Sequence, residues 1–283
     1  MTQATDPFTS AFPSSTSSPK KVVWSYGITT VPERKETTLP YTFRSLHSSG
    51  FVNPTLFADG EADRRDYHWQ FCTSDVVCRS TRLGPFLNWV LALWELYGRE
   101  PHADLYAIFQ DDIIVSRNLR AYLERTLLDS SGQVDREGYY NLFTSVGCHD
   151  YWDKRKVLTP PYGWVESAQL GWGACALVFD REAVMELLSN RELIRKPTSL
   201  SIKERSYKID GIVSDVLTAR GRPSEVDMED WHEWVHLPSL VQHVGEVSTI
   251  GHPRFSPAPS FRGESFDLMT LLKDRGGERK ERR

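Results

Sequence analysis

Two patterns of apolar and polar positions alternate along this chain. Short apolar runs bounded by turn residues are typical of strands, and apolar residues that recur every three or four positions are typical of helices. The predicted strands of the first half are 21–30, 54–58 and 105–112. The predicted helices are 38–49, 84–97 and 119–128, with Gly98 ending the second. Because strands that alternate with helices form parallel sheets covered on both faces, we expect an α/β fold with a mostly parallel central sheet.

The second half continues the pattern less regularly, after a weaker strand at 67–73. Its predicted strands and helices are 140–146, 171–179, 181–189, 209–220 and 239–245. No internal repeat or long linker interrupts residues 21–250, so we predict a single domain there. Residues 1–20, rich in Ser, Thr and Pro, are predicted to be a disordered tail, and 251–283 an extension that ends in a basic tail.

Composition narrows the possibilities only slightly. The formal net charge of -4 provides no general attraction to nucleic acid, although a local basic groove stays open. The four cysteines lack zinc-site spacing, so we expect reduced thiols. No apolar run approaches the ~20 residues that cross a bilayer, and the N-terminus lacks a secretory signal pattern. These features predict a cytoplasmic protein without a membrane span.

The pair Asp111 and Asp112 points most directly to chemistry, because it interrupts an apolar run that resumes at Ile113. Two unpaired negative charges beside a buried strand are costly, and a divalent cation removes that cost. Carboxylate oxygens suit Mg²⁺ or Mn²⁺. We therefore predict a metal site at this strand end, with Asp111 either on the ion or facing the sugar or ribose of a ligand. The alternative is a pair of solvent-facing turn acids.

Two other strand ends carry side chains that suit a nucleotide. Thr29, Thr30 and Arg34 surround the end of the first strand, where hydroxyls can hold a base edge and a guanidinium binds diphosphate in a bidentate manner. Asp59 closes the second strand at a turn. Ligands of open α/β sheets bind beyond the carboxyl ends of the strands, where these residues and the acid pair all fall. An ordinary turn explains the first loop equally well.

Two later residues each have a structural and a functional interpretation. His243 lies in an apolar strand, either as a packed core residue or as a metal ligand. Asp210 begins a predicted helix, where a carboxylate can cap the helix and also act as a general base. Asp215 lies five residues later and does not share its face well, so we favour Asp210.

A tryptophan between two glycines is the last candidate feature. Trp172 offers an indole that can stack on a sugar, and Gly173 lets a ligand approach the backbone. A packed tryptophan with glycines in a bulge is an equal alternative. The aromatic segment 230–234 is a weaker candidate for the rim of the same site.

In this order, these segments resemble the GT-A-fold glycosyltransferases, which use nucleotide-sugar donors. The resemblance covers about residues 22–248 and rests on order and spacing rather than on one motif. The segments that carry it are 28–34, 56–60, 109–113, 171–179, 210–215 and 242–245. It implies a GT-A-like, Rossmann-like fold with a nucleotide-binding half at about 21–118 and a smaller acceptor-side half at about 119–250.

The resemblance also implies roles for the candidate residues. Asp112 and His243 would hold Mn²⁺ or Mg²⁺, and Asp210 would be the base of an inverting enzyme. In the family's Asp-x-Asp motif this chain has Gln110 in place of the first Asp, which leaves open whether the metal is essential. The residues that would bind the nucleotide-sugar are Thr29, Thr30, Arg34, Asp59, Asp111, Trp172 and Gly173.

The function that the resemblance implies is transfer of a hexose from a nucleotide-diphosphate sugar to an acceptor hydroxyl. The acceptor stays open between a glycan, a lipid-linked sugar, a protein side chain and a hydroxylated base of modified DNA, for which a basic cluster (Arg64, Arg65, Arg79 and Arg82) is available. A retaining enzyme would not need the base. A metal-dependent nucleotidyltransferase is a second interpretation, but it requires a glycine-rich phosphate loop near Gly27. A binding module is a third, and it explains a buried acid pair poorly.

Overall fold

The computed structural model describes residues 21–65, 67, 75–129, 131–155, 162–167, 169, 171–191, 193, 209–218, 231–245 and 257–273. The two predicted tails, 1–20 and 275–283, lie outside the described residues. The weaker strand predicted at 67–73 also lies outside them, apart from Tyr67.

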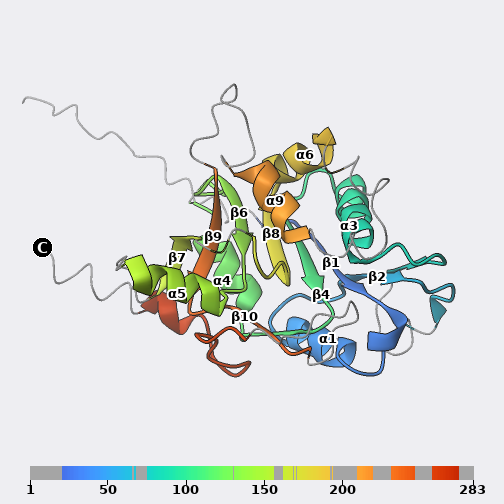
Figure 1. Cartoon of the computed structure of the whole chain (residues 1–283), viewed down its shortest axis with the longest axis horizontal. Helices are drawn as coiled ribbons and strands as arrows, with labels where there is room; N and C mark the ends of the chain where they lie inside the picture. The colour runs from blue at the N-terminus through green and yellow to red at the C-terminus, as the bar shows by residue number, and fades with distance from the viewer. Residues whose placement is uncertain are drawn as a thin grey trace, which may run out of the picture.

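An eight-stranded sheet with the order β3-β2-β1-β4-β8-β6-β9-β7 forms the centre of the molecule (Figure 1). Its strands are β1 (Trp24–Thr30), β2 (Thr55–Asp59), β3 (Val76–Arg79), β4 (Leu105–Gln110), β6 (Gly138–Asn141), β7 (Gly163–Glu166), β8 (Ala176–Asp180) and β9 (His232–Leu237). The first four run parallel, and β6 and β9 are parallel to each other. Only β8 and β7 are antiparallel to their neighbours. The predicted α/β fold with a mostly parallel central sheet is confirmed.

Helices cover both faces of this sheet, and the side chains of its central strands β4 and β8 alternate between two apolar clusters. In β4, Tyr106 and Ile108 join one cluster, and Ala107 and Phe109 join the other. The first cluster includes residues of α3, α6 and α9, and the second includes residues of α1 and α4. The helices are α1 (Leu39–Ser48), α3 (Pro85–Arg99), α4 (Leu119–Thr126), α5 (Val146–Arg155), α6 (Arg181–Ser189), α9 (Ile209–Leu217) and the 3-10 helix η1 (Pro32–Arg34).

A second, two-stranded sheet pairs β5 (Ile113–Val115) with β10 (Val241–His243). The strands are antiparallel, and His243 lies opposite Ile113. The apolar run after the acid pair therefore belongs to a different sheet from the run before it. This pairing brings residue 243 beside residue 112, from which it is separated by 131 positions of the sequence.

The C-terminal extension is described over 257–273, where Leu268 and Leu271 are buried in the same cluster as α1 and α4. Within the described part of the chain, no helix has the length and apolar character that a membrane crossing requires. Cys78 and Cys175 form no disulfide bond.

Several element boundaries differ from the sequence prediction. The helix predicted to end at Gly98 continues to Arg99, because the burial of Leu96 and its neighbours outweighs the low helix propensity of one glycine. The strand predicted at 171–179 begins only at Ala176, since Gly171 and Gly173 have φ angles of 84° and 81° that a strand does not accept.

The remaining differences concern short elements with few apolar residues. The strand predicted at 140–146 ends at Asn141, and α5 begins at Val146. The prediction missed β3, α5, β7 and β9 altogether. Strands of four to six residues that mix polar and apolar side chains are stabilised by their neighbours in the sheet, and this pairing leaves only a weak local pattern.

Candidate functional site

The acid pair lies in the turn between β4 and β5, at the carboxyl edge of the parallel strands. Asp111 and Asp112 are both 7% exposed. The interpretation of the pair as solvent-facing turn acids is therefore wrong. The sheet registers also bring the first strand ends together, since Thr29 pairs with Gln110 and Thr30 with Ala58. The predicted nucleotide residues of β1 and β2 thus share one sheet edge with the acids.

Asp111 points toward β1. The hydroxyl of Thr30 donates a hydrogen bond to Oδ2 of Asp111 over 2.7 Å. Burial and, second, the negative charge of Asp112 raise the pKa of Asp111 to about 7, against the opposing effects of Thr30 and Arg34. Thr30 and Asp111 therefore form one polar unit at the end of the first strand.

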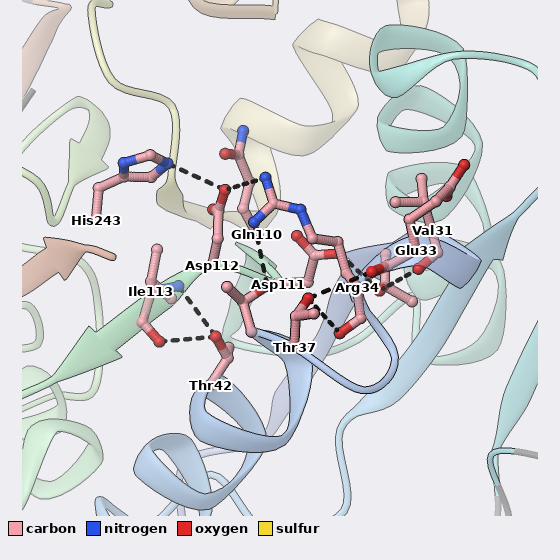
Figure 2. Close-up of polar contacts among 12 residues, drawn as sticks. Val31, Glu33, Arg34, Thr37, Thr42, Gln110, Asp111, Asp112, Ile113 and His243 are labelled. Atoms are coloured by element: carbon pink, nitrogen blue, oxygen red, sulfur yellow. Dashed lines mark hydrogen bonds and ion pairs between the residues drawn. The ribbon is translucent and has the colours of Figure 1, made fainter. Parts of the chain in front are cut away.

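Asp112 is the centre of the site, as Figure 2 shows. Its Oδ2 lies 3.0 Å from Nε2 of His243 and 3.2 Å from Nη2 of Arg34. Its Oδ1 is buried and has no hydrogen-bond partner among the residues that the structure describes. A buried carboxylate oxygen without a partner is costly, so this oxygen is available to a cation or to a donor group of a ligand.

The surrounding elements place these three side chains together. Arg34 is a buried residue of η1. Its Nη1 donates a hydrogen bond to the hydroxyl of Thr38 over 3.2 Å. Thr42 of α1 binds both the amide and the carbonyl of Ile113, which anchors β5 directly after the acids. A Cβ at Gly245 would lie 2.6 Å from Oδ2 of Asp112, so only glycine leaves room for the carboxylate there.

The residues present fit a divalent cation that the protein holds through few ligands. Among the described residues, no group of three or more His, Cys, Asp or Glu side chains is arranged to hold a metal ion. However, Mg²⁺ is usually bound by one or two carboxylates and completed by water and substrate phosphates. Asp112, through its buried Oδ1, and the adjacent His243 would be the protein ligands of such a cation.

Two residues that were predicted to bind the nucleotide form hydrogen bonds with backbone groups in the structure. Asp59 is buried, and its two carboxylate oxygens accept hydrogen bonds from the amides of Leu83 and Gly84 at 2.7 and 2.8 Å. Thr29 donates weakly to the carbonyl of Phe109 over 3.4 Å. In the structure Asp59 therefore holds the loop before α3, and a role in nucleotide binding stays a prediction for both residues.

Asp210 lies in the first turn of α9, and its Oδ2 accepts a hydrogen bond from the amide of Gly173 over 3.1 Å. Burial raises the pKa of Asp210 to about 6, although the amides of Gly173 and Ala174 oppose this. Asp215 is exposed on the same helix. A buried carboxyl with a raised pKa is suited to proton transfer near neutral pH, whereas an exposed one is not.

The buried thiol of Cys175 connects the two acidic centres. Burial and then the negative charges of Asp112 and Asp210 raise the pKa of this thiol well above its ordinary value. Both carboxylates therefore act on one thiol at the start of β8. Gln110 strengthens this arrangement, because its side chain donates to the carbonyl of Ala174 over 3.1 Å. The residue in place of the first Asp of the motif ties β4 to the turn beside Asp210.

Trp172 is 69% exposed, so the interpretation as a packed core residue is wrong. The indole stands at the tip of the turn that contains Gly173. A Cβ at Gly173 would lie 2.3 Å from Cδ1 of Phe143, which together with its φ of 81° requires glycine. The turn therefore exposes the indole of Trp172, and the backbone amide of the next residue, Gly173, binds Asp210.

The sequence analysis missed the environment of Glu233. The sequence analysis predicted no strand at 232–237, where polar and apolar residues do not alternate strictly, so the position of Glu233 in β9 was not foreseen. Of the weak aromatic candidate at 230–234, Trp234 lies in β9 with its indole bound to the carbonyl of Glu137. The proposed basic cluster is largely neutralised: Arg65 pairs with Asp63, Arg79 with Glu95, and Arg82 with Glu33.

No protein-family model matches the sequence, and no curated protein sequence matches it either. Three of the solved structures that are similar are S. aureus TarS, a cytidylyltransferase from Leptospira borgpetersenii serovar Hardjo-bovis, and GalNAc-T7 with UDP, GalNAc and Mn²⁺. Their identities are 11%, 10% and 12%, and their TM-scores 0.37, 0.42 and 0.47. The matches cover 59%, 92% and 89% of this chain, and 30%, 96% and 48% of those chains.

Proposed function

We propose that this protein is a glycosyltransferase that moves a sugar from a nucleotide-diphosphate sugar to an acceptor hydroxyl with inversion. The observation that carries the proposal is the buried carboxylate of Asp112, which contacts His243 and Arg34. One of its oxygens has no hydrogen-bond partner within the described part of the chain. A buried acid next to a histidine and an arginine suits a cation and a diphosphate together. A second buried acid, Asp210, adds a base on the side of the exposed Trp172.

In this proposal, Asp112 and His243 hold Mn²⁺ or Mg²⁺, and Arg34 binds the donor diphosphate. When bound, such a cation neutralises the charge of the diphosphate leaving group. Thr29, Thr30, Asp59 and Asp111 contact the nucleoside and the sugar. Trp172 and Gly173 line the sugar side, where the indole covers an apolar sugar face.

Asp210 accepts the proton of the acceptor hydroxyl as the hydroxyl oxygen attacks the anomeric carbon. The bond from that oxygen to the anomeric carbon forms while the bond to the diphosphate oxygen breaks. The nucleoside diphosphate leaves with both electrons of the broken bond. The acceptor stays open between a glycan, a lipid-linked sugar, a protein and modified DNA, and the cytoplasmic location stays a prediction.

A hydrolysis screen tests the function without knowledge of the acceptor. Many nucleotide sugars are incubated with the protein and Mn²⁺, and released nucleoside diphosphate is measured. We expect release from one donor class, and binding of the matching nucleoside diphosphate that strengthens when Mn²⁺ is added. Release of pyrophosphate from a nucleoside triphosphate and a sugar phosphate would instead identify a nucleotidyltransferase. Sugar binding without any turnover would identify a binding module.

The pH dependence of transfer follows from the state of Asp210. A general base works only when it is deprotonated, and burial raises the pKa of this carboxyl to about 6. We therefore expect kcat to fall about tenfold per pH unit below about 6, and to level off above it. A pH profile at saturating donor measures this limb. A limb near the ordinary aspartate value of about 4 would contradict Asp210 as the base.

A further inference from the structure

Glu233 is a buried acid that the proposed mechanism does not use. It lies in β9 in register with Tyr139 of β6 and is 5% exposed. Tyr139 belongs to the apolar cluster that includes residues of α9. Burial is the largest cause of the raised pKa of Tyr139, and the charge of Glu233 is the second. A carboxylate on this covered face is stable only if hydrogen bonds compensate its lost hydration.

Glu233 receives hydrogen bonds from the side chain of Asn141, from the amide of Gly171 and from the side chains of Ser167 and Gln169. Oε2 of Glu233 accepts the amide of Gly171 over 2.7 Å, and Oε1 accepts the side-chain amide of Asn141 over 2.9 Å. The same Asn141 nitrogen lies 3.3 Å from the carbonyl of Trp172, to which it donates. Glu233 and Asn141 therefore bind two backbone groups of the turn, the amide of Gly171 and the carbonyl of Trp172.

The opposite side of the turn lies against Asp210. A Cβ at Gly171 would lie 2.2 Å from the carbonyl oxygen of Asp210, so the turn packs directly on the backbone of α9. Two residues later, the amide of Gly173 donates to Oδ2 of Asp210. The turn is thus a short bridge with Glu233 bound at its start and Asp210 bound at its end.

We propose that Glu233 is a positioning residue that holds the 171–173 turn in the conformation that orients Asp210 and Trp172. This inference rests on the proposed function, because only that function makes Asp210 a general base. The hydrogen bonds that join Glu233, the turn and Asp210 belong to the fold itself. A carboxylate accepts two strong hydrogen bonds at fixed angles, which a neutral residue in the same place does not reproduce. Small displacements of a reacting group lower rates steeply, so the turn has to be held rigidly.

Electrostatics supplies an independent signature of this contact. Burial is the largest cause of the raised pKa of Asp210, and the charge of Glu233 is a smaller one; burial also raises the pKa of Glu233 itself. Two further ionisable groups interact with Asp210, Tyr139 from β6 and Cys175 before β8, and burial keeps both neutral where Asp210 titrates. Removal of the charge at 233 should therefore lower the pKa of Asp210, and this shift does not depend on turnover.

The test uses Glu233→Gln in the full chain. The ¹³C resonance of the Asp210 carboxyl, assigned with Asp210→Asn, reports its pKa, and amide hydrogen exchange reports the hydrogen bonds of Gly171 and Gly173. We expect a lower pKa of Asp210 and about tenfold faster exchange of the Gly171 amide. Transfer should fall about 10–100-fold, with donor affinity within about twofold of the wild type. Glu166→Gln is the matched control, because this acid lies on the neighbouring strand β7 with 65% of its side chain exposed.

Glu233→Asp separates charge from reach. It keeps the negative charge but withdraws it from Gly171, so we expect faster exchange and slower transfer with a pKa of Asp210 close to the wild-type value. If Glu233→Gln does not fold, the same measurements on Glu233→Asp test the proposal. Unchanged pKa and unchanged exchange in the folded variants would overturn the proposal. If the wild type transfers no sugar while the pKa and exchange respond as expected, the proposed function fails and the positioning contact stands.

Discussion

Replacement of Asp210 by Asn is expected to reduce sugar transfer by about 10²–10⁴-fold, the usual contribution of a general base. Asn keeps the shape of the side chain and can still accept the amide of Gly173, but it does not take up a proton at neutral pH. Donor binding should stay nearly unchanged, because Asp210 contacts neither Asp112 nor Arg34 in the described contacts. Single-turnover kinetics and titration with the nucleoside diphosphate measure the two quantities separately.

Asp215→Asn is the control on the same helix. Asp215 is exposed, so its loss should leave both transfer and binding close to the wild type. If Asp210→Asn instead lowers transfer and donor binding equally, together with thermal stability, the residue has a structural role in the first turn of α9. A variant that retains full transfer would assign the proton to another acceptor or favour a retaining mechanism.

Replacement of Asp112 by Asn is expected to weaken Mn²⁺ and nucleoside-diphosphate binding by about 100-fold or more, and to remove most transfer with them. Loss of groups that only support metal ligands already costs about 10–100-fold in affinity, and Asp112 is proposed to be a ligand itself. The substitution also removes the negative charge that Arg34 and His243 share. Calorimetric titration with Mn²⁺, with and without nucleotide, measures both losses.

Asp111→Asn is the neighbouring control for this experiment. Asp111 is engaged by the hydroxyl of Thr30, and the side chain of Asn still accepts that hydrogen bond. We therefore expect a smaller loss of metal affinity than at Asp112. A larger loss at 111 than at 112 would exchange the two assignments, and unchanged Mn²⁺ binding in Asp112→Asn would remove the metal from this site. Thermal melting of both variants establishes that each is folded.

Local pattern was sufficient for the elements that bury one regular face. The helix predicted at 181–189 and the strand that leads to Asp111 follow directly from apolar spacing, which depends only on neighbouring residues. It failed at the 171–175 turn, because glycines are compatible with a strand until their φ angles are known. It also missed β9, whose polar residues are stabilised by contacts with distant strands.

The candidate site divides in the same way. From the sequence alone, the adjacent acids after β4, the polar loop after β1 and the acid that opens α9 were visible, because each stands at the end of a locally encoded element. Only the tertiary structure decided that Asp112 contacts Arg34 and His243, that Asp59 is bound to backbone amides, and that Glu233 holds the turn before Asp210. Such contacts join residues that are tens to more than a hundred positions apart. They depend on which distant strands become neighbours in the sheet, and the free energy of the whole fold selects that order.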